Sequence, residues 1–134
     1  MDQRVKELWL KALRSDEYEQ TTGKLRIADT TSIGYCCLGV LCDLYQKDTG
    51  RGEWEQQGIE GWFVDEDEFG KVQDNVELIS TVAKWAGLDR DPTIPFTYKT
   101  NNGSESDGDK TYLALLNDNG CTFNQMADII EHLV

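Results

Sequence analysis

The densest apolar run in the chain is the stretch 35–45, which reads YCCLGVLCDLY. In a helix, four side chains of this run fall on one stripe with the spacing of a core-facing helix: Cys37, Leu41, Leu44 and Tyr45. A short apolar run also fits a buried strand, but the length of this one favours a helix over about 36–46. A glycine inside a helix costs about 1 kcal/mol relative to alanine. We therefore expect a neighbouring backbone to pass close to Gly39.

Four further segments carry helical signals. Apolar residues at helical spacing predict a first helix near the N-terminus. Asp74 and Glu77 resemble a capping box at the start of another helix. A short helix is expected over 111–116, and Thr122 with Gln125 forms a T-x-x-Q capping box before the last one. With the apolar run above, this makes about five helices around a buried central helix.

Three short segments, near 24–28, 59–64 and 94–99, have the pattern of strands. Both prolines lie near the last of these, which is typical of an edge strand. The stretch 48–61 is polar and punctuated by glycine, so we interpret it as mostly loop. No repeat and no linker divides the chain. The sequence therefore predicts a single α+β domain over 1–134, with a small antiparallel sheet.

The chain is strongly acidic, with a net charge of -12 and a pI near 4.3. Such a surface repels nucleic-acid backbones and anionic membranes. No apolar run approaches the ~20 residues of a membrane span, and the N-terminus has no signal-peptide pattern. We therefore expect a cytoplasmic protein whose four cysteines are thiols.

Five motifs follow one another along the chain: W-x-x-A-L-R-S, Y-x-Q-x-x-G-x-L, Y-C-C-L-G-V-L-C-D-L, W-A-G-L and L-N-D-N-G-x-x-F-x-x-M-A-D-I-I-E. They occupy residues 9–15, 18–25, 35–44, 85–88 and 116–131. In this order they resemble a family of small uncharacterised proteins encoded by bacteriophages and in bacterial genomes. The resemblance covers most of the chain, and the string CCLGVLCDL is specific. It implies a phage or prophage accessory protein that acts in the bacterial host cytoplasm.

Catalytic chemistry has little support in the sequence. Cys36 or Cys37 at a helix N-terminus would have a lowered thiol pKa, so a cysteine-dependent enzyme is one alternative. Such an enzyme also needs a base, and the only histidine is His132, near the C-terminus. The cysteine spacing does not match a structural zinc site. We assign no catalytic residue, no metal and no cofactor.

One binding hypothesis combines aromatic and basic residues outside the predicted helices. The aromatic members are Trp54, Trp62, Phe96 and Tyr98. The basic members are Arg26, Arg51, Lys71 and Lys99. Together they would form a pocket for an anionic ligand that contains a ring, such as a nucleotide. The alternative is that these aromatic side chains only cover the core from outside.

A second binding hypothesis uses the acidic surface against a basic host protein. Its members form two clusters: Asp65, Glu66, Asp67 and Glu68, and then Glu105, Asp107 and Asp109. The leading interpretation is a non-enzymatic phage accessory protein that blocks or sequesters a host component, either an anti-phage defence factor or its nucleotide signal. An acidic structural or interaction module is a further alternative.

Other partners follow from the same residues. The last helix carries no lysine or arginine, so we expect no direct binding of nucleic acid. No membrane partner is expected. A symmetric homodimer through an edge strand near 94–99 remains open, although the prolines oppose long edge pairing.

Overall fold

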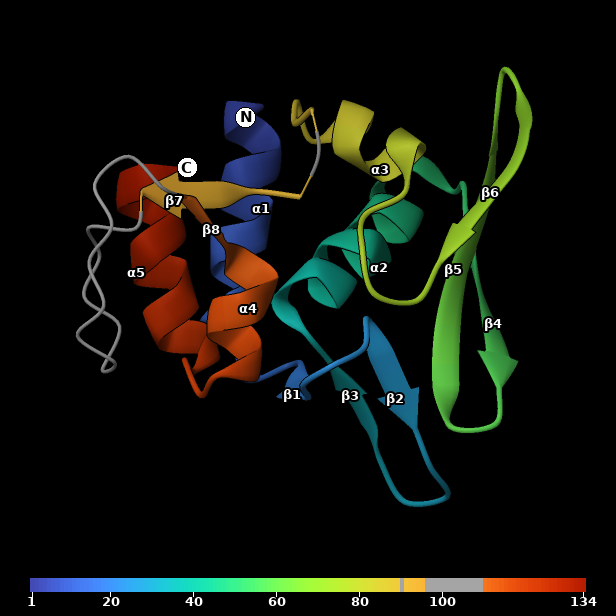
Figure 1. Cartoon of the computed structure of the whole chain (residues 1–134), viewed down its shortest axis with the longest axis horizontal. Helices are drawn as coiled ribbons and strands as arrows, with labels where there is room; N and C mark the ends of the chain where they lie inside the picture. Colours follow the sequence, from blue (N-terminus) through green and yellow to red (C-terminus); the bar gives the residue numbers. More distant parts are fainter. Residues whose placement is uncertain (90, 96–109) are drawn as a thin grey trace.

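A computed structural model describes residues 1–89, 91–95 and 110–134 (Figure 1). In these ranges there are five helices: α1 (Gln3–Leu13), α2 (Cys37–Thr49), α3 (Ser80–Trp85), α4 (Leu113–Asp118) and α5 (Phe123–Leu133). The strands in the same ranges are β1 (Glu19–Gln20), β2 (Arg26–Ala28), β3 (Ile33–Tyr35), β4 (Glu53–Gln57), β5 (Glu60–Asp67), β6 (Gly70–Asp74), β7 (Thr93–Pro95) and β8 (Lys110–Tyr112). The protein therefore belongs to the α+β class.

The main sheet has six strands and is mixed, where a small antiparallel sheet was expected. Its order is β1-β3-β2-β5-β4, and β6 pairs with the part of β5 beyond β2. The pair β1–β3 is parallel and the other pairs are antiparallel. The strand predicted near 94–99 is present only as β7, which pairs with β8 in a separate two-stranded sheet. Residues 96–99 lie outside the described residues.

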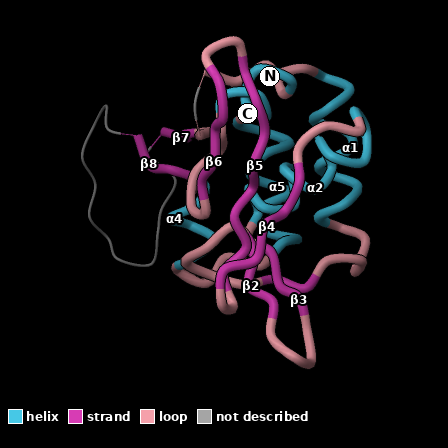
Figure 2. The backbone as a smooth tube through the Cα atoms, turned by 90° about the vertical axis from the view of Figure 1, so that its right-hand side faces the viewer, coloured by secondary structure: helices cyan, strands magenta, loops and turns pink. Residues whose placement is uncertain are grey.

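The helices lie on one side of the strands β4, β5 and β6. In Figure 1, α2 lies between these strands and the helices α1, α4 and α5, and α3 also lies against β5. Figure 2 views the strands from the side turned away from the helices, which lie behind them. Among the described residues, one face of β4–β6 is therefore left without a covering helix. Within the described ranges, no helix has both the length and the apolar character needed to cross a membrane.

Helix α2 is buried along most of its length, from Cys37 to Tyr45. Trp9 of α1 is fully buried and donates its indole N–H to the Cys37 carbonyl at 2.9 Å. A Cβ atom at Gly39 would overlap the carbonyl oxygen of Leu25. The expected close approach of a neighbouring backbone at Gly39 is thus confirmed. It brings the segment before β2 directly onto the helix.

The two predicted capping boxes have different outcomes. The Thr122 side chain accepts from the Gln125 N–H, and the Gln125 side chain accepts from the Thr122 N–H, so the box before α5 is confirmed. The box at Asp74 is wrong, because α3 begins only at Ser80. Asp74 Oδ1 instead accepts from the N–H groups of Val76 and Glu77, at 2.8 and 3.0 Å. The carboxylate stabilises a local turn, which is the competing use of an aspartate.

Three of the sequence motifs meet at the fully buried Asn117. Its amide oxygen accepts from Gln20 Nε2 at 2.8 Å and from the Cys37 N–H at 3.3 Å. Its amide nitrogen donates to the Thr21 carbonyl at 2.9 Å. The side chain therefore joins α4, the start of α2 and the segment around β1. These motif residues hold the fold together, since a buried amide must have its hydrogen bonds satisfied.

Candidate functional site

Four described members of the predicted aromatic and basic set lie on two opposite faces of the sheet, and the fifth, Arg51, lies in the loop before β4. Trp54 packs its ring against Phe63, 4.9 Å between centroids, on the face that meets α2. Successive side chains of a strand point to opposite faces, so Trp62 lies on the other side. Lys71 pairs in register with Glu66 and shares that outer face with Trp62. These four members therefore do not line one pocket.

On the inner face, Arg26 and Trp54 belong to a polar cluster around Asp43. The guanidinium of Arg26 lies 5.3 Å from the centre of the Trp54 ring. The buried Asp43 carboxylate accepts from Tyr18 Oη at 2.6 Å and from Trp54 Nε1 at 3.2 Å, and Lys47 Nζ lies 3.1 Å away. Burial, followed by the bond to Asp43, raises the pKa of Tyr18 to about 12. Tyr18, Trp54 and Lys47 already use Asp43 as a partner, which indicates a structural role, whereas the buried Nε of Arg26 has no hydrogen-bond partner among the described residues.

The remaining predicted residues in the segment after β7 cannot be placed. Phe96, Tyr98 and Lys99 of the aromatic and basic set lie outside the described residues. The same is true of the second acidic cluster, Glu105, Asp107 and Asp109.

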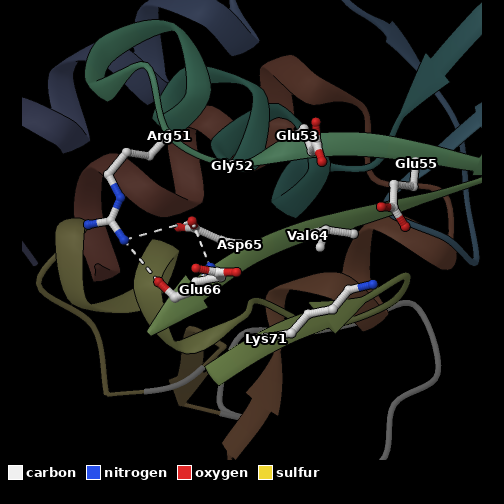
Figure 3. Close-up of a pocket in the computed structure, with 8 residues that line it drawn as sticks. All are labelled: Arg51, Gly52, Glu53, Glu55, Val64, Asp65, Glu66 and Lys71. Atoms are coloured by element: carbon white, nitrogen blue, oxygen red, sulfur yellow. Dashed lines mark hydrogen bonds and ion pairs between the residues drawn. The ribbon is translucent and has the colours of Figure 1, made fainter. Parts of the chain in front are cut away.

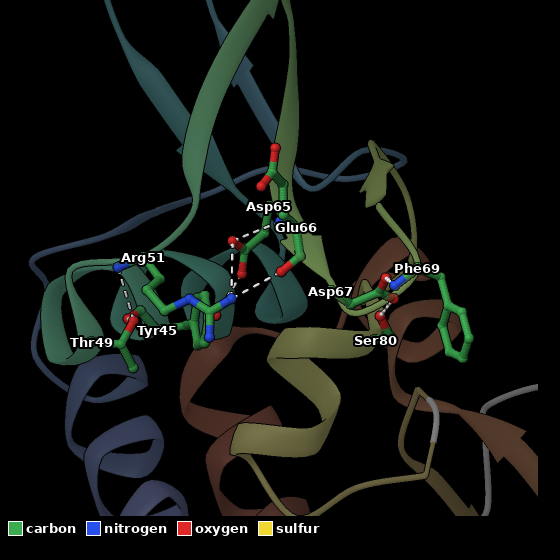
Figure 4. Close-up of polar contacts among 8 residues, drawn as sticks. All are labelled: Tyr45, Thr49, Arg51, Asp65, Glu66, Asp67, Phe69 and Ser80. Carbon is green, nitrogen blue, oxygen red and sulfur yellow. Dashed lines mark hydrogen bonds and ion pairs between the residues drawn. The ribbon is translucent and has the colours of Figure 1, made fainter. Parts of the chain in front are cut away.

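The acidic stretch 65–68 does not form one continuous exposed patch. Asp65 is tied into the structure, since it accepts from Tyr45 Oη at 2.5 Å and lies 3.8 Å from Arg51 Nη2 (Figure 4). Burial by itself would raise the pKa of Asp65, but the bond from Tyr45 and other donors hold it below its usual value. Glu66 and Glu68 are exposed, and Asp67 is half-buried. Exposed and less exposed carboxylates alternate along this stretch because every second side chain of a strand points toward the core.

Asp67 links the hairpin formed by β5 and β6 to helix α3. Its Oδ2 accepts from Ser80 Oγ at 3.0 Å, and its Oδ1 accepts from the Phe69 N–H at 2.8 Å (Figure 4). One carboxylate thus fixes both the turn 67–70 and the contact of that turn with the start of α3. We call residues 67–70 the hairpin tip.

The outer face of β4–β6 carries a shallow hollow of about 550 Å³ (Figure 3). Strand pairing places the side chains of this outer sheet face next to one another: Glu53, Glu55, Trp62, Val64, Glu66 and Lys71. Val64 is buried at 7 % exposure even though no helix covers this side. Its direct neighbours across the strands are Glu53 of β4 and the uncharged Gln73 of β6. The face is an apolar centre with an acidic rim.

A second hollow of about 780 Å³ lies between the hairpin tip, the end of α2 and α3. It shares Arg51 and Glu66 with the first hollow, so the two are adjacent. Arg51 Nη2 donates to the Glu66 carbonyl at 2.9 Å, yet its side chain stays 59 % exposed. The two linings together contain three basic and six acidic residues. A cationic partner complements this charge better than a phosphate does.

Phe69 is the site residue that sequence reasoning missed. Its side chain is 90 % exposed at the hairpin tip and lines the second hollow. Figure 4 shows the ring directed away from the contact of Asp67 with Ser80. The available signal was the sequence D-E-F-G, in which an aromatic residue directly precedes a turn glycine.

The cysteines have the environment of core side chains. Cys36 and Cys37 are buried, and all four cysteines are free thiols. Burial raises the pKa of Cys36 to about 11 and that of Cys37 well above its usual value. The dipole effect expected at the helix N-terminus is thus outweighed by burial. Among the described residues, no group of three or more His, Cys, Asp or Glu side chains is arranged to hold a metal ion.

A family model described as a domain of unknown function, DUF8296, matches residues 1–134. The chain belongs to the DUF8296 family. No curated protein and no solved structure matches it. The family match spans the outer sheet face and the hairpin tip, so both are parts of the DUF8296 domain. The bacteriophage context implied by the motifs stays a prediction.

Proposed function

We propose that this DUF8296 chain is a non-catalytic binding protein that blocks a basic protein partner with its outer sheet face. The observation that carries the proposal is a sheet face without a covering helix, in which an apolar centre is surrounded by carboxylates. Protein interfaces commonly combine a desolvated centre with a polar rim. Here Trp62 and Val64 form the centre, and Glu53, Glu55 and Glu66 form the rim.

Charge determines the kind of partner. An acidic rim attracts a basic protein at long range and accelerates association, and it repels phosphate backbones and other acidic surfaces. Only Lys71 and Arg51 offset the carboxylates that line the outer hollow, and Arg51 is already engaged with Asp65 and Glu66. The partner surface is therefore rich in lysine or arginine.

The cellular setting rests on the motif resemblance. A phage or prophage accessory protein in the bacterial cytoplasm would use this face to occlude a host component, such as an anti-phage defence factor. In this proposal α2 is the central scaffold, because it supports the sheet from the covered side and leaves the other side free.

Two alternatives have less support from the geometry. Sequestration of a nucleotide by this set needs several aromatic and basic groups around one ligand, whereas the described members divide into two separate pairs, Arg26 with Trp54 and Lys71 with Trp62, on opposite faces. A cysteine-dependent enzyme needs an accessible thiolate, whereas burial raises the pKa of Cys36 and Cys37.

The test compares two charge-reversed variants with equal changes in net charge. One carries Glu53→Lys, Glu55→Lys and Glu66→Lys on the outer sheet face. The control carries three reversals of exposed residues on α1 and beside β1: Glu7→Lys, Glu17→Lys and Glu19→Lys. Each immobilised protein is exposed to bacterial cytoplasmic extract, and the retained proteins are quantified by mass spectrometry.

We expect the native chain and the control to retain the same basic proteins at about 50 mM salt and to release them at about 300 mM, because salt screens exposed charges. The outer-face variant should retain them at least about tenfold less. Equal retention by the two variants, or retention of acidic proteins that salt does not release, would contradict the proposal.

A further inference from the structure

We propose that Phe69 at the hairpin tip is an anchor that inserts into an apolar pocket with a basic rim on the partner protein. This inference rests on the proposed function and deepens it, since it identifies the residue that contributes most binding energy. It also specifies what the partner must offer at that point. The outer sheet face then supplies charge complementarity beside the anchor.

The exposure of Phe69 has no explanation within the described chain. At 90 % it is far more exposed than the other exposed large apolar side chains, of which the next is Ile59 at 56 %. Burying a phenylalanine side chain is favourable because it removes a large apolar surface from water. That free energy is unused in the isolated chain and becomes available when a partner covers the ring. Buried aromatic anchors of this kind dominate the energetics of many interfaces.

The backbone that carries Phe69 is already fixed. Asp67 and Gly70 are paired across the hairpin, so Glu68 and Phe69 form its two-residue end. Asp67 then accepts from the Phe69 N–H and, with its other oxygen, from Ser80 of α3. A pre-formed tip loses little conformational freedom on binding, which increases the affinity obtained from each contact.

The charged residues around the Phe69 ring determine which kind of molecule can cover it. Glu66, Asp67 and Glu68 line the same hollow as Phe69, and Arg51 and Lys84 line it too, so carboxylates outnumber basic groups around the anchor. A second copy of the chain is an unsuitable occupant, because each copy has a net charge of -12. An anionic lipid surface is repelled for the same reason. A protein pocket rimmed by lysine or arginine complements both the ring and the carboxylates around it.

The chain offers a matched control for Phe69. Ile59 is an exposed apolar side chain in the turn between β4 and β5, at the other end of β5. Replacing either residue by alanine removes exposed apolar surface and leaves the core intact. Both variants should therefore unfold at the same denaturant concentration as the native chain. A loss of binding then cannot be attributed to unfolding.

The experiment begins with the photocrosslinker p-benzoylphenylalanine, placed at position 69 or at position 59 of the chain in bacterial cells. The protein crosslinked from position 69 is identified and purified. Its dissociation constant is then measured with the native chain, Phe69→Ala, Ile59→Ala and the variant with three reversals on the outer sheet face.

We expect a discrete crosslink to a basic protein from position 69 and none from position 59. Phe69→Ala should weaken binding about 10- to 100-fold, which is typical of an interface hot spot, and Ile59→Ala less than about twofold. Native affinity in Phe69→Ala, or equal crosslinking from both positions, would overturn the inference. If Phe69→Ala alone binds normally and the charge-reversed variant does not, the proposed function stands without this anchor. Normal binding by the charge-reversed variant refutes the proposed function itself.

Discussion

At residue 39 the absence of a side chain determines how closely α2 approaches the rest of the chain. The position faces the backbone of Leu25, and the carbonyl of that residue also accepts the Cys36 N–H at 3.1 Å. The same carbonyl therefore contacts the start of the helix and fills the space next to Gly39. A methyl group there would have to displace backbone atoms, which are much less adjustable than a flexible side chain.

We predict that Gly39→Ala destabilises the protein by more than about 3 kcal/mol, in spite of the higher helix propensity of alanine. Chemical denaturation monitored by circular dichroism measures the change. Glycine-to-alanine substitution at an unobstructed helix position normally stabilises, so an unchanged or increased free energy of unfolding would show that α2 does not contact Leu25 as described.

Cys36 provides a second prediction at this scale. It is the N-cap of α2, and its Sγ accepts from the Gly39 N–H at 3.4 Å. Serine is a better N-cap than most residues, so Cys36→Ser should keep the free energy of unfolding within about 1 kcal/mol of the native value. Retention of partner proteins should also be unchanged. A folded Cys36→Ser chain that lost its function would instead support a cysteine-dependent enzyme.

Local rules predicted several residues correctly from the sequence. The contact at Gly39 was predicted because a glycine lowers the stability of a helix and therefore needs a structural reason. The capping box of Thr122 with Gln125 was predicted because its two residues are near neighbours in the chain. The separation of Trp54 from Trp62 depends on strand register, which no local pattern specifies. The role of Asn117 depends on partners about one hundred residues away and was equally inaccessible.

At the scale of elements, α3 is connected to the segment before β7 through Asp91. Asp91 Oδ1 accepts from the Leu78 N–H at 2.8 Å, just before the helix begins. Burial, with smaller effects of Glu77 and Asp74, raises the pKa of Asp91 to about 6. Since the carboxyl binds its proton more tightly in the folded chain, this group lowers the free energy of unfolding as the pH rises from about 4 to about 6.

We predict that Asp91→Asn removes this pH-dependent loss. The amide oxygen still accepts from Leu78, and no charge is then buried, so the variant should be more stable than the native chain at pH 7. A shift of this size is worth about 3 kcal/mol for a fully buried group, and partial exposure reduces the expected gain to about 1 kcal/mol. Thermal unfolding from pH 3.5 to pH 7.5 measures it, because this range spans the window from about pH 4 to about pH 6.

A matched control is Glu77→Gln, which removes a neighbouring negative charge and keeps Asp91. In this variant the pH at which stability falls should move downward, because the pKa of Asp91 is then raised less. Identical pH profiles for the native chain and Asp91→Asn would show that the carboxyl is not buried as described.

The errors at the level of elements have physical causes. β4 was interpreted as loop because only Trp54 among its residues contacts the core, and the outward positions are Glu or Gln. An edge strand with one buried side chain produces almost no alternating pattern. The start of α3 was misplaced because an aspartate stabilises a turn as readily as a helix start, and only tertiary contacts decide between them.

On the scale of the whole molecule, the helices occupy one side of β4–β6, and no helix of the described ranges covers the other side. The net charge of -12 was evident from the sequence, but its arrangement around Trp62 and Val64 was not. In that arrangement the acidic side chains form a rim around an apolar centre on the outer sheet face. The central claim is that this surface, with the hairpin tip beside it, contacts the partner protein.

The most direct test is hydrogen–deuterium exchange of the chain alone and in complex with the basic protein that it retains from extract. The account predicts slower amide exchange in the complex over β4, β5, β6 and the hairpin tip, with α1 and α5 unchanged. Slower exchange confined to α1 and α5, with β4–β6 unaffected, would place the interface on the opposite side of the molecule and contradict the account.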